Sequence, residues 1–235
     1  MRIYLAIIAL ICFSCEQPNS DLSEFYDAAG GLEMWNNLEE LSFTKKSRLF
    51  YPDSTIEQQS LQKQIFRNSP EFYAEIIYLQ DSLQRRIIQN GEQVKLFEKG
   101  EEVTDQEKID KARTNIRTAY YIIALPFKLQ DEGVNVQSIK TDTMPLFDES
   151  RVIHVTHDSN PDQNWWLYFD LERSEMQGYL IEHDNRFSYI MNDITEKVDG
   201  LVLPIERRSV ALDNNFQNAY LRADYIYSDY KVKTK

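Results

Sequence analysis

The 235-residue chain has few of the residues that loops, linkers and cross-links require: seven glycines, seven prolines and two cysteines. So few glycines could hardly build a phosphate-binding loop, and the Gly-x-Ser-x-Gly motif of many hydrolases does not occur. No shift in composition divides the sequence, and no period of about 20–50 residues repeats. We therefore expect one domain.

Basic residues are also scarce, with 26 Lys and Arg against 38 Asp and Glu, for a net charge of −12. A chain this acidic is repelled by nucleic acid and by anionic lipid head groups. The charge balance therefore argues against either as an electrostatic partner.

Both cysteines lie within the first fifteen residues, beside the one long apolar run of the chain. This run, residues 3–13, matches the apolar core of a signal peptide and is shorter than the roughly 20 residues that span a bilayer. Ser14-Cys15 resembles the end of a bacterial lipobox, in which a small residue precedes a cysteine that becomes lipidated. A cut before Cys12 would place isoleucine at the small-residue position, so Cys15 is the better candidate. The alternatives are an ordinary secretory signal or a buried strand.

We expect residues 1–14 to be a signal peptide, residues 15–21 a lipidated cysteine with a short tether, and residues 22–235 a single domain. Loss of the only charge in the signal, Arg2, moves the net charge from −12 to −13. Cys15 would then be the only cysteine, so no disulfide can form, although the envelope would permit one. The expected location is the cell envelope, with the outer membrane, facing the periplasm, favoured over the inner membrane or the cell surface.

Helical spacing of apolar residues predicts a helix over residues 22–29, which a glycine pair ends, and a short helical turn over residues 32–38. A longer helix is expected over residues 104–125. Thr104 and Glu107 have the spacing of a capping box, and the proline after residue 125 ends the helix.

Elsewhere the apolar period is two, which predicts strands. The expected strands are residues 41–51, 56–67, 71–79, 82–89, 93–98, 134–141, 151–157, 164–171, 176–182, 187–195, 201–211 and 216–227. These eleven or twelve strands have short links, which favours an antiparallel sheet. Some, such as residues 71–79, are apolar on both faces, as a sheet curled around an apolar helix would be. The fold class is therefore mainly β (α+β).

Three segments resemble a known family: Ala-Ala-Gly-Gly-Leu-Glu-Met-Trp at residues 28–35, Tyr-Tyr-Ile-Ile-Ala-Leu-Pro-Phe-Lys-Leu at 120–129 and Asp-Gly-Leu-Val-Leu-Pro at 199–204. They are similar to uncharacterised Gram-negative lipoproteins with the fold of the outer-membrane lipoprotein carrier and receptor (LolA/LolB-like). The resemblance implies a curved antiparallel half-barrel of about eleven strands, with helices covering its concave face. In the carrier family that face binds acyl chains.

Candidate catalytic and metal-binding residues are few. His154 and His157 are three apart on an expected strand, so their side chains point to opposite faces. The carboxylate pairs Glu39-Glu40 and Glu101-Glu102 lie in polar surroundings and are typical of a solvated surface. We expect no metal, no cofactor and no catalysis.

Aromatic and apolar residues on neighbouring elements instead suggest a cavity for an apolar ligand. The residues proposed to line it are Phe72, Ala74, Tyr78, Ile116, Tyr120, Ile123, Trp165 and Phe187. The plain alternative is a packed core. Tyr225, Tyr227 and Tyr230 are expected at the surface of an edge strand. The sequence thus favours a membrane-anchored protein that binds a lipid or lipidated partner without catalysis, and the rival is a protein-interaction or envelope-sensing module with a packed interior.

Overall fold

The structure is a computed structural model that describes residues 22–68, 70–144, 147–183, 186–213 and 218–235. Cys15, the expected signal peptide and the tether lie outside the described residues. Within the described ranges the helices are α1 (Ser23–Ala28), α2 (Leu32–Asn36), the longer α3 (Gln106–Ile123) and the 3-10 helix η1 (Phe127–Gln130).

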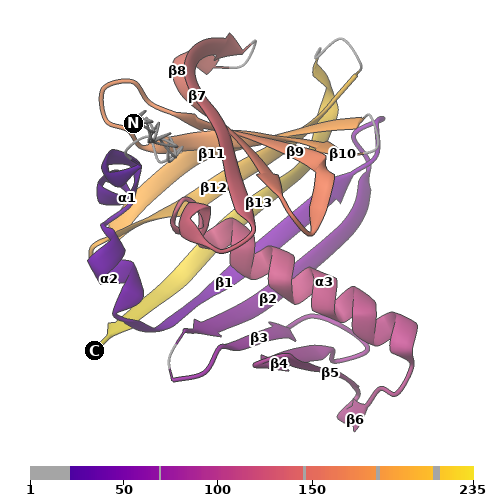
Figure 1. The fold of residues 1–235 in the computed structure, drawn as a ribbon. Helices are drawn as coiled ribbons and strands as arrows, with labels where there is room; N and C mark the ends of the chain where they lie inside the picture. Colours follow the sequence, from indigo (N-terminus) through magenta and orange to yellow (C-terminus); the bar gives the residue numbers. More distant parts are fainter. Residues whose placement is uncertain (1–21, 69, 145–146, 184–185, 214–217) are drawn as a thin grey trace, which may run out of the picture.

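Thirteen strands form one antiparallel, curved sheet in the described part of the chain (Figure 1). The strands are β1 (Leu38–Phe50), β2 (Ile56–Arg67), β3 (Tyr73–Tyr78), β4 (Arg86–Asn90), β5 (Gln93–Glu98), β6 (Glu101–Glu102), β7 (Val134–Met144), β8 (Phe147–His157), β9 (Asn160–Phe169), β10 (Met176–His183), β11 (Arg186–Val198), β12 (Leu201–Leu212) and β13 (Asn218–Thr234). The expected mainly β half-barrel is confirmed. Its strand count exceeds the expected one because the two-residue β6 is too short to show a period.

The sheet order is β6-β5-β4-β3-β2-β1-β13-β12-β11-β10-β9-β8-β7, so the first and last strands are neighbours in the middle. The chain therefore reaches one edge at β6 and must resume at the opposite edge, β7. The segment that makes this crossing contains α3 and η1, and α3 lies across the concave side of the sheet (Figure 1).

Helix α3 begins one residue later than the capping-box pattern predicts. Its N-cap is Asp105, whose carboxylate accepts hydrogen bonds from the backbone N–H groups of Glu107 (3.0 Å) and Lys108 (3.2 Å). The expected cap, Thr104, is wrong, because a carboxylate one residue further on satisfies the same free N–H groups.

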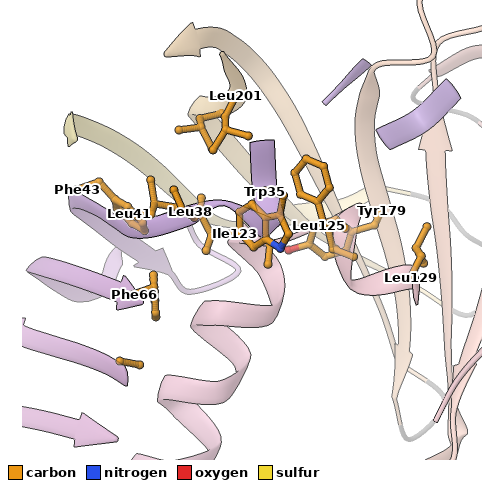
Figure 2. Close-up of a cluster of buried hydrophobic side chains, with 14 of the residues drawn as sticks. Trp35, Leu38, Leu41, Phe43, Phe66, Ile123, Leu125, Leu129, Tyr179 and Leu201 are labelled. Atoms are coloured by element: carbon orange, nitrogen blue, oxygen red, sulfur yellow. The ribbon is translucent and has the colours of Figure 1, made fainter. Parts of the chain in front are cut away.

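A continuous apolar core fills the space between α3 and the concave face. Ala112, Ile116 and Ile123 of α3 are 5%, 0% and 4% exposed, and they share one cluster with Phe66 and Ile76 of the sheet. Near the C-terminal end of α3, Trp35, Tyr179 and residues of β1 join this cluster (Figure 2). A second cluster on the opposite face of β8 to β12 includes Tyr168, Leu180 and Val210.

At one end of the half-barrel, the short helices pack closely against the turn before β12. We call this contact the junction around Gly30. A Cβ atom on Gly30, whose φ is +117°, would lie 2.4 Å from the carbonyl oxygen of Gly200, so only glycine fits there. The N–H of Val202 donates to the carbonyl of Ala29 (3.0 Å). The ring of Trp35 stacks on Phe127 of η1, with the ring centroids 4.7 Å apart.

We predict that Ile116→Asp lowers the free energy of unfolding by about 3–5 kcal/mol, because it places an unpaired charge in the closed core. Lys111→Glu on the outer side of α3 removes only an exposed pair with Glu107 and should cost less than about 1 kcal/mol. Urea unfolding of both variants measures the two values. Equal losses would show that the inner face of α3 is not buried against the sheet.

Candidate binding cavity

A cavity of about 700 Å3 lies beside the C-terminal half of α3. Helix α3 and the segment after it contribute Arg117, Thr118, Tyr120, Tyr121, Lys128, Asp131 and Glu132 to its lining. The β2–β5 half of the sheet and its turns contribute Phe72, Gln89 and Glu92, and the β8–β9 hairpin contributes His157, Ser159, Asn160, Gln163 and Trp165. Both halves of the sheet therefore meet at this cavity, which has the size of a small-molecule site.

Two aromatic pairs form much of its wall. Tyr120 packs against Phe72 with ring centroids 4.8 Å apart, and Tyr121 meets Trp165 edge-on at 5.4 Å. Successive residues of a helix point about 100° apart, which lets one turn of α3 contact both halves of the sheet. The hydroxyl of Tyr120 is satisfied by donating to the side-chain oxygen of Asn68 (2.7 Å).

The polar groups beside this wall are largely uncharged. The Tyr121 hydroxyl lies 2.7 Å from Nε2 of His157, and burial lowers the pKa of His157 below its ordinary value. The imidazole is therefore neutral at pH 7. Nε1 of Trp165 is buried without a partner among the described residues.

Two ion pairs belong to the lining, one exposed to solvent and one beside the ring of Tyr120. Arg117 contacts Glu92 at 2.6 Å, and the Glu92 side chain is 93% exposed. Lys128 pairs with Asp131. An exposed pair such as Arg117–Glu92 contributes little to stability. The cavity thus combines an aromatic wall with a charged outer rim, which suits an amphiphilic ligand.

Three of the eight residues proposed from the sequence, Phe72, Tyr120 and Trp165, line this cavity. Ala74, Ile116 and Ile123 belong to the closed core, with exposures of 0%, 0% and 4%. Tyr78 is not among the residues that line the cavity, and its hydroxyl accepts a hydrogen bond from the side chain of Asn115 (2.9 Å). Phe187 packs against the second cluster, on the other face of the sheet, so it does not line the cavity.

Tyr121, Lys128 and His157 line the cavity and were not proposed from the sequence. The sequence could have indicated Tyr121 as a lining residue, because it lies in the apolar C-terminal end of the predicted helix. His154 and His157 do point to opposite faces: His154 stacks on Trp166, and His157 meets Trp165. Among the described residues, no group of three or more His, Cys, Asp or Glu side chains could hold a metal ion.

The expectation of surface positions for the C-terminal tyrosines is wrong for Tyr227, which is 4% exposed and packs against Phe43. Tyr225 and Tyr230 are half-buried against the same core cluster. The reason is topological, because β13 pairs with both β1 and β12 and is not an edge strand.

Comparison with known proteins gives a fold and no family. No family model and no curated protein matches the sequence. Among solved structures, a LolA superfamily protein from Nitrosomonas europaea matches with a TM-score of 0.55 at 10% identity, covering 90% of this chain and 93% of that one. A DUF1329 family protein from Desulfovibrio piger matches with a TM-score of 0.54 at 8% identity, covering 88% and 91%.

A putative outer membrane lipoprotein-sorting protein domain from Vibrio parahaemolyticus matches with a TM-score of 0.52 at 9% identity. This match covers 83% of the present chain and 86% of that domain. All three likenesses extend over most of both chains. The chain therefore has a LolA-like fold.

Proposed function

We propose that the chain is a lipid-anchored protein of the cell envelope that binds a lipid or lipidated partner in its half-barrel without catalysing a reaction. The observation that supports this most is the cavity of about 700 Å3 with its wall of Phe72, Tyr120, Tyr121 and Trp165. Each methylene of an alkyl chain buried against such a wall contributes about 0.8 kcal/mol. A chain of ten or more methylenes would thus bind without any covalent step.

The fold agrees with this proposal, since one of the similar structures is a lipoprotein-sorting domain and another a LolA superfamily protein. The anchor is proposed from the Ser14-Cys15 pattern in the sequence. None of the described helices has the length and apolar character needed to cross a membrane. We favour the outer membrane, with the domain facing the periplasm.

The second candidate function is a protein-interaction or envelope-sensing module. It is favoured by the closed core beneath α3, where Ala74, Ile76 and Ile116 are all 0% exposed. This part of the concave face has no space for a ligand. A protein partner would then bind elsewhere on the domain, and the cavity would stay solvent-filled.

Filling the cavity tests the first candidate. We predict that delipidated protein binds an environment-sensitive fluorophore, that palmitate displaces it at micromolar concentration, and that Thr118→Trp weakens both affinities at least about tenfold. Thr118 is exposed and lines the cavity, so the added indole occupies ligand space without disturbing the core. Fluorescence titration measures both affinities.

Thr114→Trp is the matched control, because Thr114 is an exposed residue one turn earlier on α3 and outside the cavity lining. This variant should bind as the wild type does. If delipidated wild type binds neither probe nor palmitate, the interaction module is the better proposal. If Thr118→Trp binds normally, the ligand site is not this cavity.

The anchor has a separate test. We predict that Cys15→Ser moves the protein from the membrane to the soluble envelope fraction, whereas Cys12→Ser remains membrane-bound. Several acyl chains on one residue give stable attachment, so the shift should be nearly complete. Fractionation followed by immunoblotting measures it, and equal membrane retention of the two variants would contradict lipidation at Cys15.

A further inference from the structure

Two basic side chains point into the half-barrel on either side of Tyr227. Lys45 of β1 is paired in register with Tyr227 of β13, and its Nζ lies 4.7 Å from the ring centroid of Tyr225 and 5.7 Å from that of Tyr227. On the other side, the guanidinium carbon of Arg207 of β12 lies 5.6 Å from the Tyr227 ring. Tyr227 belongs to the core cluster of the concave face, so this group lies on the floor of the half-barrel.

Neither cation forms an ion pair with a described residue. On the outer face of the same strands, two arginines do form ion pairs: Arg208 with Asp193 (2.7 Å) and Arg48 with Asp224. The groups that interact with Arg207 are the uncharged side chains of Asn192, Tyr179, Tyr227 and Tyr230. Glu175 lines the same small pocket as Arg207 but forms no ion pair with it. In a chain with a net charge of −12, the floor therefore carries uncompensated positive charge.

Arg207 is only 4% exposed. Its Nε donates to the side-chain oxygen of Asn192 (2.6 Å), but Nη1 is buried without a partner in the described part of the chain. Burying a cation without a counter-charge is costly, and an anion that reaches it relieves that cost. Burial alone would raise the pKa of Tyr227, yet Lys45 and Arg207 hold it below its ordinary value, as expected at positive potential.

Solvent reaches this group from the Lys45 side. Lys45, Gln62 and Tyr225 are half-buried, whereas Tyr227 and Arg207 are each 4% exposed behind them. The group also adjoins the candidate cavity through a single aromatic layer. Tyr179, which faces Arg207, stacks on the cavity residue Trp165 with ring centroids 5.5 Å apart.

We propose that Lys45, Arg207 and Tyr227 form a binding site for the oxyanion head group of an amphiphile, a carboxylate or a phosphate joined to an alkyl chain. The head group contacts Lys45 first and is held by charge-assisted hydrogen bonds from Lys45, the Tyr227 hydroxyl and Arg207. The acidic outer surface repels an anion at long range, whereas Lys45 and Arg207 attract it at contact. The inference rests on the proposed amphiphile binding and adds the charge of the ligand.

The test compares palmitate with its neutral counterpart hexadecanol on delipidated full-domain protein, by fluorophore displacement at low ionic strength. We expect Lys45→Gln to weaken palmitate binding about tenfold or more and to change hexadecanol binding less than about twofold. Lys46→Gln is the matched control, since this neighbouring residue points to the outer face and should leave both affinities unchanged. Arg207→Gln should act like Lys45→Gln if its thermal melt shows a folded protein, and Lys45→Gln decides the question if it does not.

Palmitoyl lysophosphatidic acid and inorganic phosphate complete the series. If Lys45→Gln lowers the affinities for palmitate and for the lysophospholipid by the same factor, the result supports one shared oxyanion site. If inorganic phosphate alone displaces palmitate at micromolar concentration, the site is for free anions and the amphiphile proposal is wrong. If palmitate and hexadecanol bind equally and Lys45→Gln changes neither, the head-group site is wrong while the cavity stands. If neither chain binds, both proposals fail.

Discussion

Pairing between β1 and β13, the first and last strands, determines where every other element of this domain lies. Their ladder extends from Leu38 and Thr234 to Leu49 and Ala223 and places both ends of the domain in the middle of the sheet. The two outermost strands are consequently β6 and β7, which are consecutive in the chain. The connection between them must traverse the sheet, and a helix is the structure that satisfies its own backbone on the way. Because this pairing joins residues nearly 200 positions apart, the domain depends on contacts that form slowly during folding.

The crossing helix divides the concave face into unlike parts. Along its first turns, Ala112 and Ile116 are packed against the sheet and leave no free volume. Towards its end, the larger Tyr120 and Tyr121 contact Phe72 and Trp165 on the two halves of the sheet and border the cavity. The central strands β1 and β12 place two basic side chains, Lys45 and Arg207, on the same concave face. One surface therefore serves as core, as cavity wall and as a charged floor.

The sequence predicted the sheet, its antiparallel character and the helix well, because these follow from local periodicity and short links. Side-chain placement was less predictable. Phe187 looked like a wall residue, but β11 carries apolar residues on both faces, and Phe187 shares a face with Tyr189 and Met191 of the second cluster. The alternating pattern alone does not tell which of the two faces is concave. Tyr227 looked exposed because the order of strands in a sheet is not a local property. Tyr121 and His157 became partners only through the crossing of α3 over the β8–β9 hairpin.

The junction around Gly30 bears on what a likeness in sequence can reveal. Three segments of the sequence, residues 28–35, 120–129 and 199–204, carry its resemblance to LolA/LolB-like proteins. They meet at this junction: Gly30 touches Gly200, Ala29 bonds Val202, and Trp35 stacks on Phe127. Their most recognisable residues are those that seal one end of the half-barrel. Two proteins that share these segments therefore share the packing at this end of the half-barrel, and they can differ in the residues that line the rest of its concave face.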